Sequence, residues 1–366
     1  MNGPIKVAVL LPSLNVGGAE RLVIEELAWL KNDPEFSFAV HLVFEKGLMF
    51  ETLRSLGLPF FVWDAPHKSV RMLGQYAAII RHIRANKYHI LHSHLLDGIG
   101  PLVGKLAGVR VVATAHIDKE YTAVERFVLA LSDLVLACGQ RVSENVGRFI
   151  PPGKIARLDN AIRMPEKRDL RRADIVRKFG IKPGSRILLT LGRLTRQKGI
   201  DVLLRSFSEV AHIVPDAFLL IGGDGEERAN LERMAKSLHC SDRIRFAGMI
   251  GDVHEVLSVC DLYINSSRCE GLPMTLLEAM SHALPIIATR VGCNHEVIHD
   301  GETGMLVPPD DPKRLSEAIV GMLRDDQFRK KVGSAAHDFF CRSYTIDQHC
   351  TKLKEFYLRV FSRSTN

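Results

Sequence analysis

With 366 residues, the chain is too long for one ordinary hydrophobic core and about right for two domains, which usually have roughly 100–200 residues each. Its 46% hydrophobic and 25% charged residues are ordinary globular composition, which excludes a collagenous or disordered chain. The net charge of +7 lies in residues 1–180, which hold 25 Lys and Arg against 18 Asp and Glu; with no basic run or nucleic-acid-binding signature, we expect no nucleic-acid partner.

The first half of the sequence alternates short apolar segments with amphipathic ones. Strands are expected at Val7–Leu11, Val40–Phe44, Phe60–Trp63, Ile90–Leu91, Val111–Ala115 and Leu134–Ala137. Helices are expected near residues 19–30, 50–55, 69–85, 98–106, 123–131 and 141–149. Because the strands show almost no polar alternation, they should be buried on both faces, as in a parallel sheet between helices. Residues 1–165 are therefore predicted to form a doubly wound, Rossmann-like domain.

The second half repeats this pattern after a polar, proline-containing linker that begins at Asn160. Strands are expected at Ile187–Leu191, Ala217–Ile221, Ile244–Ala247, Leu262–Ile264, Ile286–Ala288 and Met305–Val307. The predicted fold class is thus α/β, with a second Rossmann-like domain in residues 166–345 and a cleft between the domains at the carboxyl ends of their strands. A C-terminal helix in residues 346–366 is expected to cross back to the first domain.

The cysteines and the apolar runs indicate a cytoplasmic protein. Seven cysteines, an odd number without a C-x-x-C pair, favour free thiols in a reducing compartment over disulfides or a zinc site. The N-terminus lacks a signal-peptide pattern, and no apolar run reaches the roughly 18–20 residues that span a bilayer. We expect a cytoplasmic location, or peripheral attachment to the cytoplasmic face of a membrane.

Two glutamates eight positions apart follow a strand of the second domain. Glu270 lies in the loop after Leu262–Ile264, and Glu278 lies on a helix that begins at about Met274. One carboxylate and the unpaired N–H groups of a helix N-terminus can then face the same ligand, which would suit a phosphorylated sugar. Surface charge is the alternative interpretation of the pair taken alone.

A basic loop, LGRLTRQKG, follows the strand Ile187–Leu191. Its Arg193 and Lys198 can neutralise the charge that grows on a diphosphate leaving group. The turn Gly222–Gly225 ends another strand of the same domain, so three loops should converge on one edge of the sheet. The absence of G-x-G-x-x-G disfavours a dehydrogenase. Because D-x-D is absent too, we expect no metal, with the Arg/Lys pair in its place.

Glycines and histidines follow strands of the first domain. Gly17 and Gly18 come after the first strand and allow a ligand or backbone to approach closely. His116 ends the strand Val111–Ala115, and His92 and His94 follow Ile90–Leu91. Each histidine alone is more often structural or solvated than functional.

The combination resembles the retaining family-4 glycosyltransferases of the GT-B fold over nearly the whole chain. Glu270 to Glu278 is similar to the E-x7-E signature of that family, within EGLPMTLLEAM and followed by LPIIATRVG and DGETGMLVPPDDP. The resemblance implies that Glu278 holds the ribose hydroxyls of the donor nucleotide and that Glu270 contacts hydroxyls of the donor sugar. Arg193 and Lys198 would bind the diphosphate.

The resemblance also implies roles for the remaining site residues. Backbone N–H groups around Met274 and Thr275 would help to bind the diphosphate. Gly17 and Gly18 would lie against donor phosphate or acceptor, and His116 is similar to the family's histidine near the anomeric carbon. The first domain would bind the acceptor and the second the nucleotide-sugar. That donor is a substrate, so no cofactor is expected.

These implications predict a retaining glycosyltransferase of cell-surface polysaccharide or glycolipid biosynthesis. It would move a hexose or N-acetylhexosamine, with a UDP-sugar favoured as donor, to a glycan or lipid-linked acceptor. No cleft carboxylate stands out as a nucleophile, so the acceptor should attack on the face that the leaving group departs from. The alternatives are a GDP-mannose-dependent mannosyltransferase, another GT-B enzyme such as an epimerase or phosphorylase, and a non-catalytic nucleotide-sugar-binding protein.

The helix expected at residues 69–85 has an apolar face and a basic one. The apolar side chains are Val70, Leu73, Ile80 and Ile83, and the basic ones are Lys68, Arg71, Arg81, Arg84 and Lys87. Two interpretations stay open: a helix that packs on the sheet with a solvated basic side, and a surface that contacts an anionic membrane through the first domain.

Overall fold

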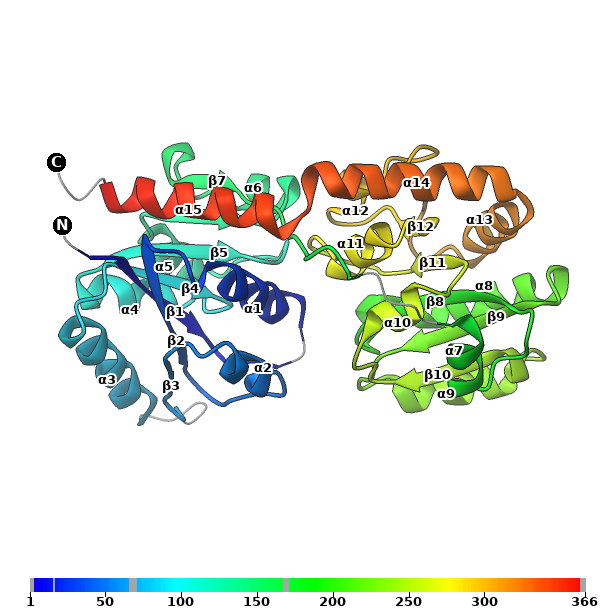
Figure 1. Ribbon diagram of the computed structural model, residues 1–366, viewed down its shortest axis with the longest axis horizontal. Helices are drawn as coiled ribbons and strands as arrows, with labels where there is room; N and C mark the ends of the chain where they lie inside the picture. Colours follow the sequence, from blue (N-terminus) through cyan, green and yellow to red (C-terminus); the bar gives the residue numbers. More distant parts are fainter. Residues whose placement is uncertain (1–2, 16, 66–70, 167–170, 363–366) are drawn as a thin grey trace. The chain divides into compact units, whose positions relative to one another are not determined.

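The computed structural model describes residues 3–15, 17–65, 71–166 and 171–362. Its chain divides into two compact units, each built on a parallel β-sheet (Figure 1). Unit 1 comprises residues 1–163 and 346–366, and unit 2 comprises residues 164–345. The last segment of the chain therefore belongs to the first unit.

Unit 1 has a seven-stranded sheet in the order β3-β2-β1-β4-β5-β6-β7. Its strands are β1 Ile5–Leu11, β2 Phe36–Leu42, β3 Phe60–Val62, β4 Ile90–His94, β5 Arg110–Ala115, β6 Leu134–Ala137 and β7 Ile155–Arg157. Its helices are α1 Gly18–Leu30, α2 Phe50–Ser55, α3 Arg71–Ala85, α4 Gly100–Ala107, α5 Ala123–Ala130, α6 Gln140–Val146, the 3-10 helix η1 Pro152–Lys154, and α15 Ile346–Ser362.

Both faces of this sheet are buried, which explains why its strands read as continuous apolar runs. Val7 and Val9 of β1 belong to a core that includes side chains of α1 and α15. Ala8 and Leu10 belong to a second core, on the opposite face, that includes side chains of α3 and α4. Successive residues of a strand point to opposite faces, so a strand covered on both sides needs apolar residues at every position.

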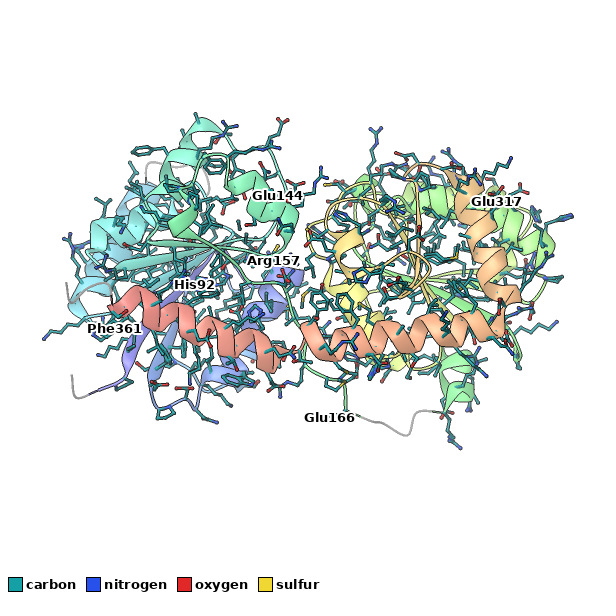
Figure 2. The ribbon with its side chains drawn as sticks, turned by 90° about the horizontal axis from the view of Figure 1, so that it is seen from above. His92, Glu144, Arg157, Glu166, Glu317 and Phe361 are labelled. Atoms are coloured by element: carbon teal, nitrogen blue, oxygen red, sulfur yellow. The ribbon has the colours of Figure 1, made fainter. Side chains whose placement is uncertain are left out.

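Helix α15 packs on unit 1 although it follows unit 2 in the chain. Leu353 and Tyr357 are buried in the core of unit 1. The ring of His349 bonds Glu26 of α1 at 2.8 Å, and Trp29 of the same helix donates to Asp347 at 2.7 Å. The helix is thus an integral part of the first unit (Figure 2).

Unit 2 has a six-stranded sheet in the order β10-β9-β8-β11-β12-β13. Its strands are β8 Arg186–Leu191, β9 Ala217–Gly222, β10 Ile244–Gly248, β11 Leu262–Asn265, β12 Ile286–Thr289 and β13 Met305–Val307. Its helices are α7 Arg172–Lys178, η2 Arg196–Lys198, α8 Ile200–Ile213, α9 Arg228–Ser237, η3 Ser241–Arg243, α10 Val253–Leu257, α11 Met274–Ser281, α12 Asn294–Val297, α13 Pro312–Arg324 and α14 Asp326–Ser343.

The two sheets share one topology. In each, the first three strands run outward from the middle in one direction and the later strands run outward in the other. The order therefore reverses between β1 and β4 in unit 1 and between β8 and β11 in unit 2. This is the doubly wound arrangement of Rossmann-like domains, as predicted, and ligands of such sheets bind at the carboxyl ends of the strands where the order reverses.

Two details of unit 1 differ from the sequence-based expectation. Strand β7 was not predicted, because three residues at the edge of a sheet carry too little periodicity to be recognised. His92 and His94 do not follow a strand but lie within β4, which is longer than expected.

The predicted apolar face of α3 is partly wrong. Leu73 is 66% exposed, because it lies at the margin of the core-facing stripe in the first turn of the helix. The α3 side chains that pack in the core include Tyr76, Ile79, Ile80 and Ile83. Arg84 donates to the carbonyl groups of Leu106 and Ala107, so it joins α3 to α4. The expected residues Lys68 and Val70, and the side chain of Arg71, lie outside the described part.

Candidate functional site

The loops that end β8 and β9 contact each other through their backbones. The N–H of Gly192 donates to Gly222 at 3.0 Å, and the N–H of Leu194 donates to Asp224 at 2.8 Å. Gly223 has φ +130°, and a Cβ there would lie 1.9 Å from the carbonyl oxygen of Gly192. Only glycine fits this close approach, so the Gly222–Gly225 turn fixes the path of the basic loop beside it.

The loops that end β8 and β11 are joined as well. The N–H of Arg268 donates to the carbonyl of Gln197 at 2.7 Å, and the hydroxyl of Ser266 donates to the carbonyl of Lys198 at 3.0 Å. A Cβ on Gly199, which has φ +60°, would lie 2.1 Å from the carbonyl oxygen of Ser266. Because β8 and β11 flank the reversal of strand order, these loops lie where ligands of such sheets bind.

The structure brings Lys198 and Glu270 into contact at this edge. Lys198 Nζ lies 2.6 Å from Oε1 of Glu270, whose side chain is buried. The same oxygen accepts a bond from Ser267 Oγ at 2.6 Å and one from Asn265 Nδ2 at 3.3 Å. None of the described residues bonds Oε2. Oε1 is therefore held by three donors, and Oε2 can accept a hydrogen bond from a hydroxyl group of a ligand.

The other predicted residues of unit 2 lie on the flanking segments. Arg193, in the loop after β8, is exposed, and its guanidinium makes no hydrogen bond or ion pair with the described residues. Met274 and Thr275 begin α11, whose N-cap Pro273 offers no side-chain hydrogen bond. The first N–H groups of that helix can therefore receive an anion. Glu278 is buried one turn further along α11.

Gly17 and Gly18 lie at the carboxyl end of β1, where α1 begins. Gly17 is the N-cap residue in extended conformation, and a Cβ there would lie 2.3 Å from Oε2 of Glu20. Small residues at this position leave room for the Glu20 carboxylate beside the first turn of the helix. These glycines and His116 belong to unit 1, whereas the carboxylates and cations above belong to unit 2.

His116 is buried at the end of β5 and pairs with His94 of β4. Nε2 of His116 lies 3.1 Å from Nδ1 of His94. Burial lowers the pKa of His116 to about 4, with a smaller contribution from the charge of His349, so the ring is neutral near pH 7. Nδ1 of His116 has no partner among the described residues. This nitrogen is itself buried.

His92 lies behind this pair and is satisfied on both ring nitrogens. Nδ1 lies 2.7 Å from the Tyr357 hydroxyl of α15, and Nε2 lies 2.7 Å from the Thr114 hydroxyl. Burial, followed by the charges of His116 and His349, lowers the pKa of His92 to about 3. A neutral ring that donates once and accepts once fits these contacts, which makes His92 a structural residue.

Sequence analysis missed several residues around the site. Asn265 and Ser267 bond Glu270, Asn294 bonds Asn265 at 3.2 Å, and Arg268 bonds the basic loop. The sequence feature that could have indicated these residues is the run of polar residues directly after an apolar strand, in INSSRCE.

In the described residues, no group of three or more His, Cys, Asp or Glu side chains is arranged to hold a metal ion, and no helix is long and apolar enough to span a bilayer. None of the seven cysteines, all of which lie in the described residues, forms a disulfide bond.

Two family models match the chain. Residues 16–164 match the Glycosyltransferase Family 4 model, and residues 171–339 match the model of glycosyl transferases group 1. A relative is N-acetyl-alpha-D-glucosaminyl L-malate synthase of Bacillus anthracis, 28% identical over 70% of each chain. Another is the UDP-Gal:alpha-D-GlcNAc-diphosphoundecaprenol alpha-1,3-galactosyltransferase of Escherichia coli, 23% identical over 97% of each chain.

A solved structure supports the same fold. Anabaena Alr3699/HepE in complex with UDP-glucose aligns with a TM-score of 0.86 at 19% identity, covering 97% of this chain and 99% of that one. The predicted GT-B fold is confirmed. Since the two family models together span most of the sequence, the chain belongs to the family-4 glycosyltransferases of the GT-B fold and is an enzyme of that class.

Proposed function

We propose that this glycosyltransferase is a retaining enzyme that moves a hexose or N-acetylhexosamine from a UDP-sugar to a glycan or lipid-linked acceptor. The product would enter a cell-surface polysaccharide or a glycolipid. The observation that carries the proposal is the contact of Lys198 with Glu270 where the strand order of unit 2 reverses. A cation and a carboxylate there match the two parts of a nucleotide-sugar, its diphosphate and its hydroxyl groups.

Unit 2 would bind the nucleotide diphosphate through cations and backbone donors. Arg193 has no ion pair with any described residue, and Lys198 has two ammonium hydrogens beyond the one that it gives Glu270. The N–H groups at Met274 and Thr275 would add the start of α11. Negative charge grows on the diphosphate as the bond to the sugar breaks, and fixed positive groups stabilise that charge without a metal. Glu278 would accept hydrogen bonds from the ribose hydroxyls.

Glu270 and His116 would act on the sugar. With Oε1 held by three donors, Glu270 would present Oε2 to the donor sugar hydroxyls. His116 would lie near the anomeric carbon, and its ring is neutral near pH 7 because burial lowers its pKa to about 4. Gly17 and Gly18 would admit donor phosphate or acceptor at the start of α1. The acceptor hydroxyl would attack on the leaving-group face, and the diphosphate would take its proton.

The comparisons favour a UDP-sugar and retention. The similar Anabaena structure holds UDP-glucose, and the Escherichia coli relative is named for UDP-Gal and an alpha-1,3 product. The common UDP-hexoses carry an α bond to the diphosphate, so an α product retains the configuration. A GDP-mannose-dependent mannosyltransferase and a non-catalytic nucleotide-sugar-binding protein are the alternative outcomes of the experiment below.

The experiment measures release of nucleoside diphosphate from a panel of UDP-, GDP- and ADP-sugars in the presence of EDTA. We expect slow hydrolysis of one UDP-sugar by the wild type. Glu278→Ala should slow it about tenfold or more, because a hydrogen bond to a charged group contributes about 1.5–3 kcal/mol. Glu317→Ala, on the exposed side of α13, is the matched control and should leave the rate unchanged (Figure 2).

Each other outcome has a defined meaning. Cleavage of GDP-mannose alone would make the chain a mannosyltransferase. A donor that raises the melting temperature but is never cleaved, even with a panel of glycan acceptors, would favour the non-catalytic alternative. If no donor is cleaved or bound, the proposed roles of Glu278, Glu270, Arg193 and Lys198 are wrong.

We also propose that the protein attaches peripherally to the cytoplasmic face of an anionic membrane through unit 1. Large apolar side chains are exposed on α3, α4 and α5: Leu73, Leu106, Val124 and Phe127. Helix α4 contacts both α3 and α5. Arg81 and Lys87 add exposed positive charge at the end of α3. Such a mixed surface binds anionic bilayers.

A sedimentation experiment tests this attachment. The wild type should pellet with vesicles that contain phosphatidylglycerol and should stay in solution with pure phosphatidylcholine vesicles. Phe127→Ser should weaken the pelleting, because it removes an exposed ring from the apolar surface. Equal sedimentation with both vesicle types would remove the proposal.

A further inference from the structure

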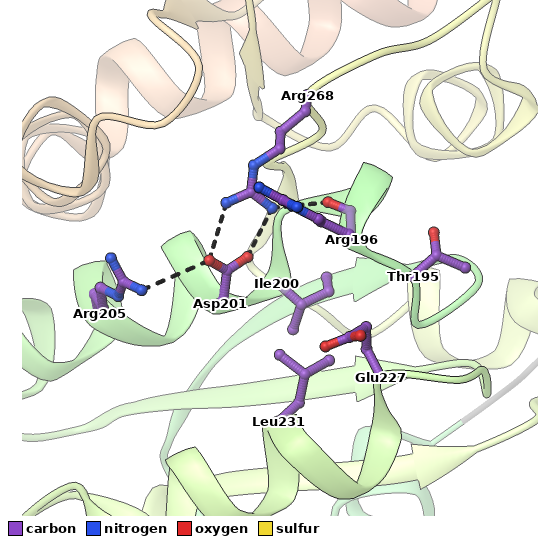
Figure 3. A pocket seen from close by; sticks show the side chains of 8 residues that line it. All are labelled: Thr195, Arg196, Ile200, Asp201, Arg205, Glu227, Leu231 and Arg268. Carbon is purple, nitrogen blue, oxygen red and sulfur yellow. Dashed lines mark hydrogen bonds and ion pairs between the residues drawn. The ribbon is translucent and has the colours of Figure 1, made fainter.

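One guanidinium group connects four segments around the candidate site of unit 2. Nη1 and Nη2 of Arg268 lie 2.9 Å from the two carboxylate oxygens of Asp201 (Figure 3). Nε lies 2.6 Å from Asp310 Oδ1, and Nη1 also donates to the carbonyl of Arg196 at 2.7 Å. Arg268 belongs to the loop after β11, Arg196 to η2, Asp201 to the first turn of α8, and Asp310 to the turn before α13.

The segments that Arg268 joins carry the two site residues that contact each other. Arg268 precedes Glu270 by two residues, Arg196 precedes Lys198 by two residues, and Asp201 follows Lys198 by three. The backbone N–H of Arg268 also donates to Gln197, between Arg196 and Lys198. The side chain and backbone of Arg268 therefore join the loop of Lys198 to the loop of Glu270, in addition to the bond from Ser266 to the carbonyl of Lys198.

The geometry of these contacts requires an arginine. The planar fork makes two parallel bonds to Asp201 while its remaining donors reach a second carboxylate and a carbonyl group, which a lysine cannot reproduce. The Arg268 side chain is 23% exposed. Burial would raise the pKa of Asp201, but the hydrogen bonds and charge of Arg268 outweigh burial and hold that pKa below its ordinary value. The pair is thus fully charged at neutral pH.

We propose that Arg268 is a positioning residue for the transfer reaction: it holds Lys198 and Glu270 at the separation that diphosphate and sugar require together. The inference rests on the proposed function of those two residues. Reaction rates depend steeply on such spacing, because a misplacement of about 1 Å can cost about 100-fold in rate. Without Arg268, each loop would still bind its part of the donor, but the two parts would no longer be aligned.

A neighbouring cavity makes the substitution tolerable for the fold. Arg268 borders a cavity of about 380 Å³ on the side of the loops where α8 and α9 begin (Figure 3). Its other lining residues are Thr195, Arg196, Ile200, Asp201, Arg205, Glu227 and Leu231. The Asp201 side chain lines this cavity and is already 30% exposed, so removal of the guanidinium does not leave it as a buried, unpaired charge. Variants of Arg268 should therefore fold.

The experiment compares Arg268→Met and Arg268→Lys with Arg205→Met as a matched control. Arg205 lies 3.8 Å from the same Asp201 carboxylate, is mostly exposed, and bonds neither loop. With the donor that the wild type cleaves, we expect kcat of Arg268→Met to fall about 30- to 100-fold while the donor KM changes less than about threefold. Arg268→Lys should recover part of kcat, and Arg205→Met should behave as the wild type.

Asp201→Asn provides a second route to the same answer, because it keeps the shape of the partner and removes its charge. Asp201→Asn should lower kcat, as Arg268→Met does, and its melting temperature should stay close to that of the wild type. If Arg268→Met does not fold, the kcat values of Arg268→Lys and Asp201→Asn test the positioning role.

Failure of the proposed function and failure of the positioning role would give different results. If the wild type cleaves no donor, the proposed function fails. If the wild type is active and the Arg268 and Asp201 variants match Arg205→Met in both kcat and KM, the positioning role is overturned. A rise in KM without a fall in kcat would overturn it as well, since it would make Arg268 a contributor to donor binding alone.

Discussion

At the scale of single residues, the neutral histidines of unit 1 make a prediction about pH. Burial lowers the pKa of His92 to about 3, whereas an unfolded histidine has a pKa of about 6.5. Between these values the unfolded chain binds a proton that the folded chain does not. The free energy of unfolding must therefore fall as the pH falls below 6.5, and His92 adds no pH dependence above it. Burial also lowers the pKa of His41 to about 3 and that of His116 to about 4. These histidines therefore also lower the free energy of unfolding as the pH falls.

A substitution isolates this contribution. Between pH 7.5 and pH 5.5, His92 should account for about 1.4 kcal/mol of lost stability. His92→Gln should reduce the difference in unfolding free energy between the two pH values by that amount, measured by denaturant titration. The exposed His295→Gln serves as the control and should keep the wild-type difference. An unchanged pH dependence in His92→Gln would mean that folding does not lower the pKa of this histidine.

Some residues of the site could be predicted from the sequence and others could not. Glu270 and Glu278 could be recognised because both the spacing and the surrounding run belong to one continuous segment. Arg268 could not, because its role comes from contact with Asp201, 67 positions away in the chain. The pairing of His94 with His116 likewise depends on the register of β4 with β5, in which His94 lies opposite Thr114.

At the scale of elements, strands with both faces buried were predicted well, since burial on two sides imposes a continuous apolar run. Strand β6 was predicted with its bounds, Leu134–Ala137. The edge strand β7 was missed, because its three residues include the exposed Arg157. Helix α3 was found, but its core-facing side was misjudged at Leu73. Which of several apolar residues faces the core depends on how the helix lies on the sheet, and that is a tertiary property.

Helix α15 yields the prediction at this scale. Leu353 is fully buried in the core that α15 shares with α1 and the sheet of unit 1. Leu353→Ala should lower the free energy of unfolding of unit 1 by about 2–5 kcal/mol, the usual range for a buried leucine. Glu355→Ala, two residues away on the exposed side, should change it by less than about 0.5 kcal/mol. Chemical denaturation of the whole chain measures both, and equal effects would mean that α15 is not anchored in that core.

At the scale of the whole molecule, the candidate residues are divided between two units of one topology. Unit 2 carries the groups suited to a nucleotide diphosphate, and unit 1 carries His116 and the glycines at the start of α1. In each unit these residues follow strands at or beside the point where the strand order reverses. The same architecture thus supplies both sets of groups.

We propose that protein cations, in place of a metal ion, bind and activate the diphosphate of the sugar donor. The most direct test is the rate of UDP release from the preferred UDP-sugar in EDTA, for the wild type, Lys198→Met and Lys182→Met. Lys182 is an exposed lysine of unit 2 outside the site, so it is the matched control. We predict that the wild type and Lys182→Met turn over equally and that Lys198→Met is slower by about 100-fold. Loss of wild-type activity in EDTA that a divalent cation restores would mean that the reaction needs a metal ion. Equal rates in both lysine variants would mean that Lys198 does not activate the diphosphate.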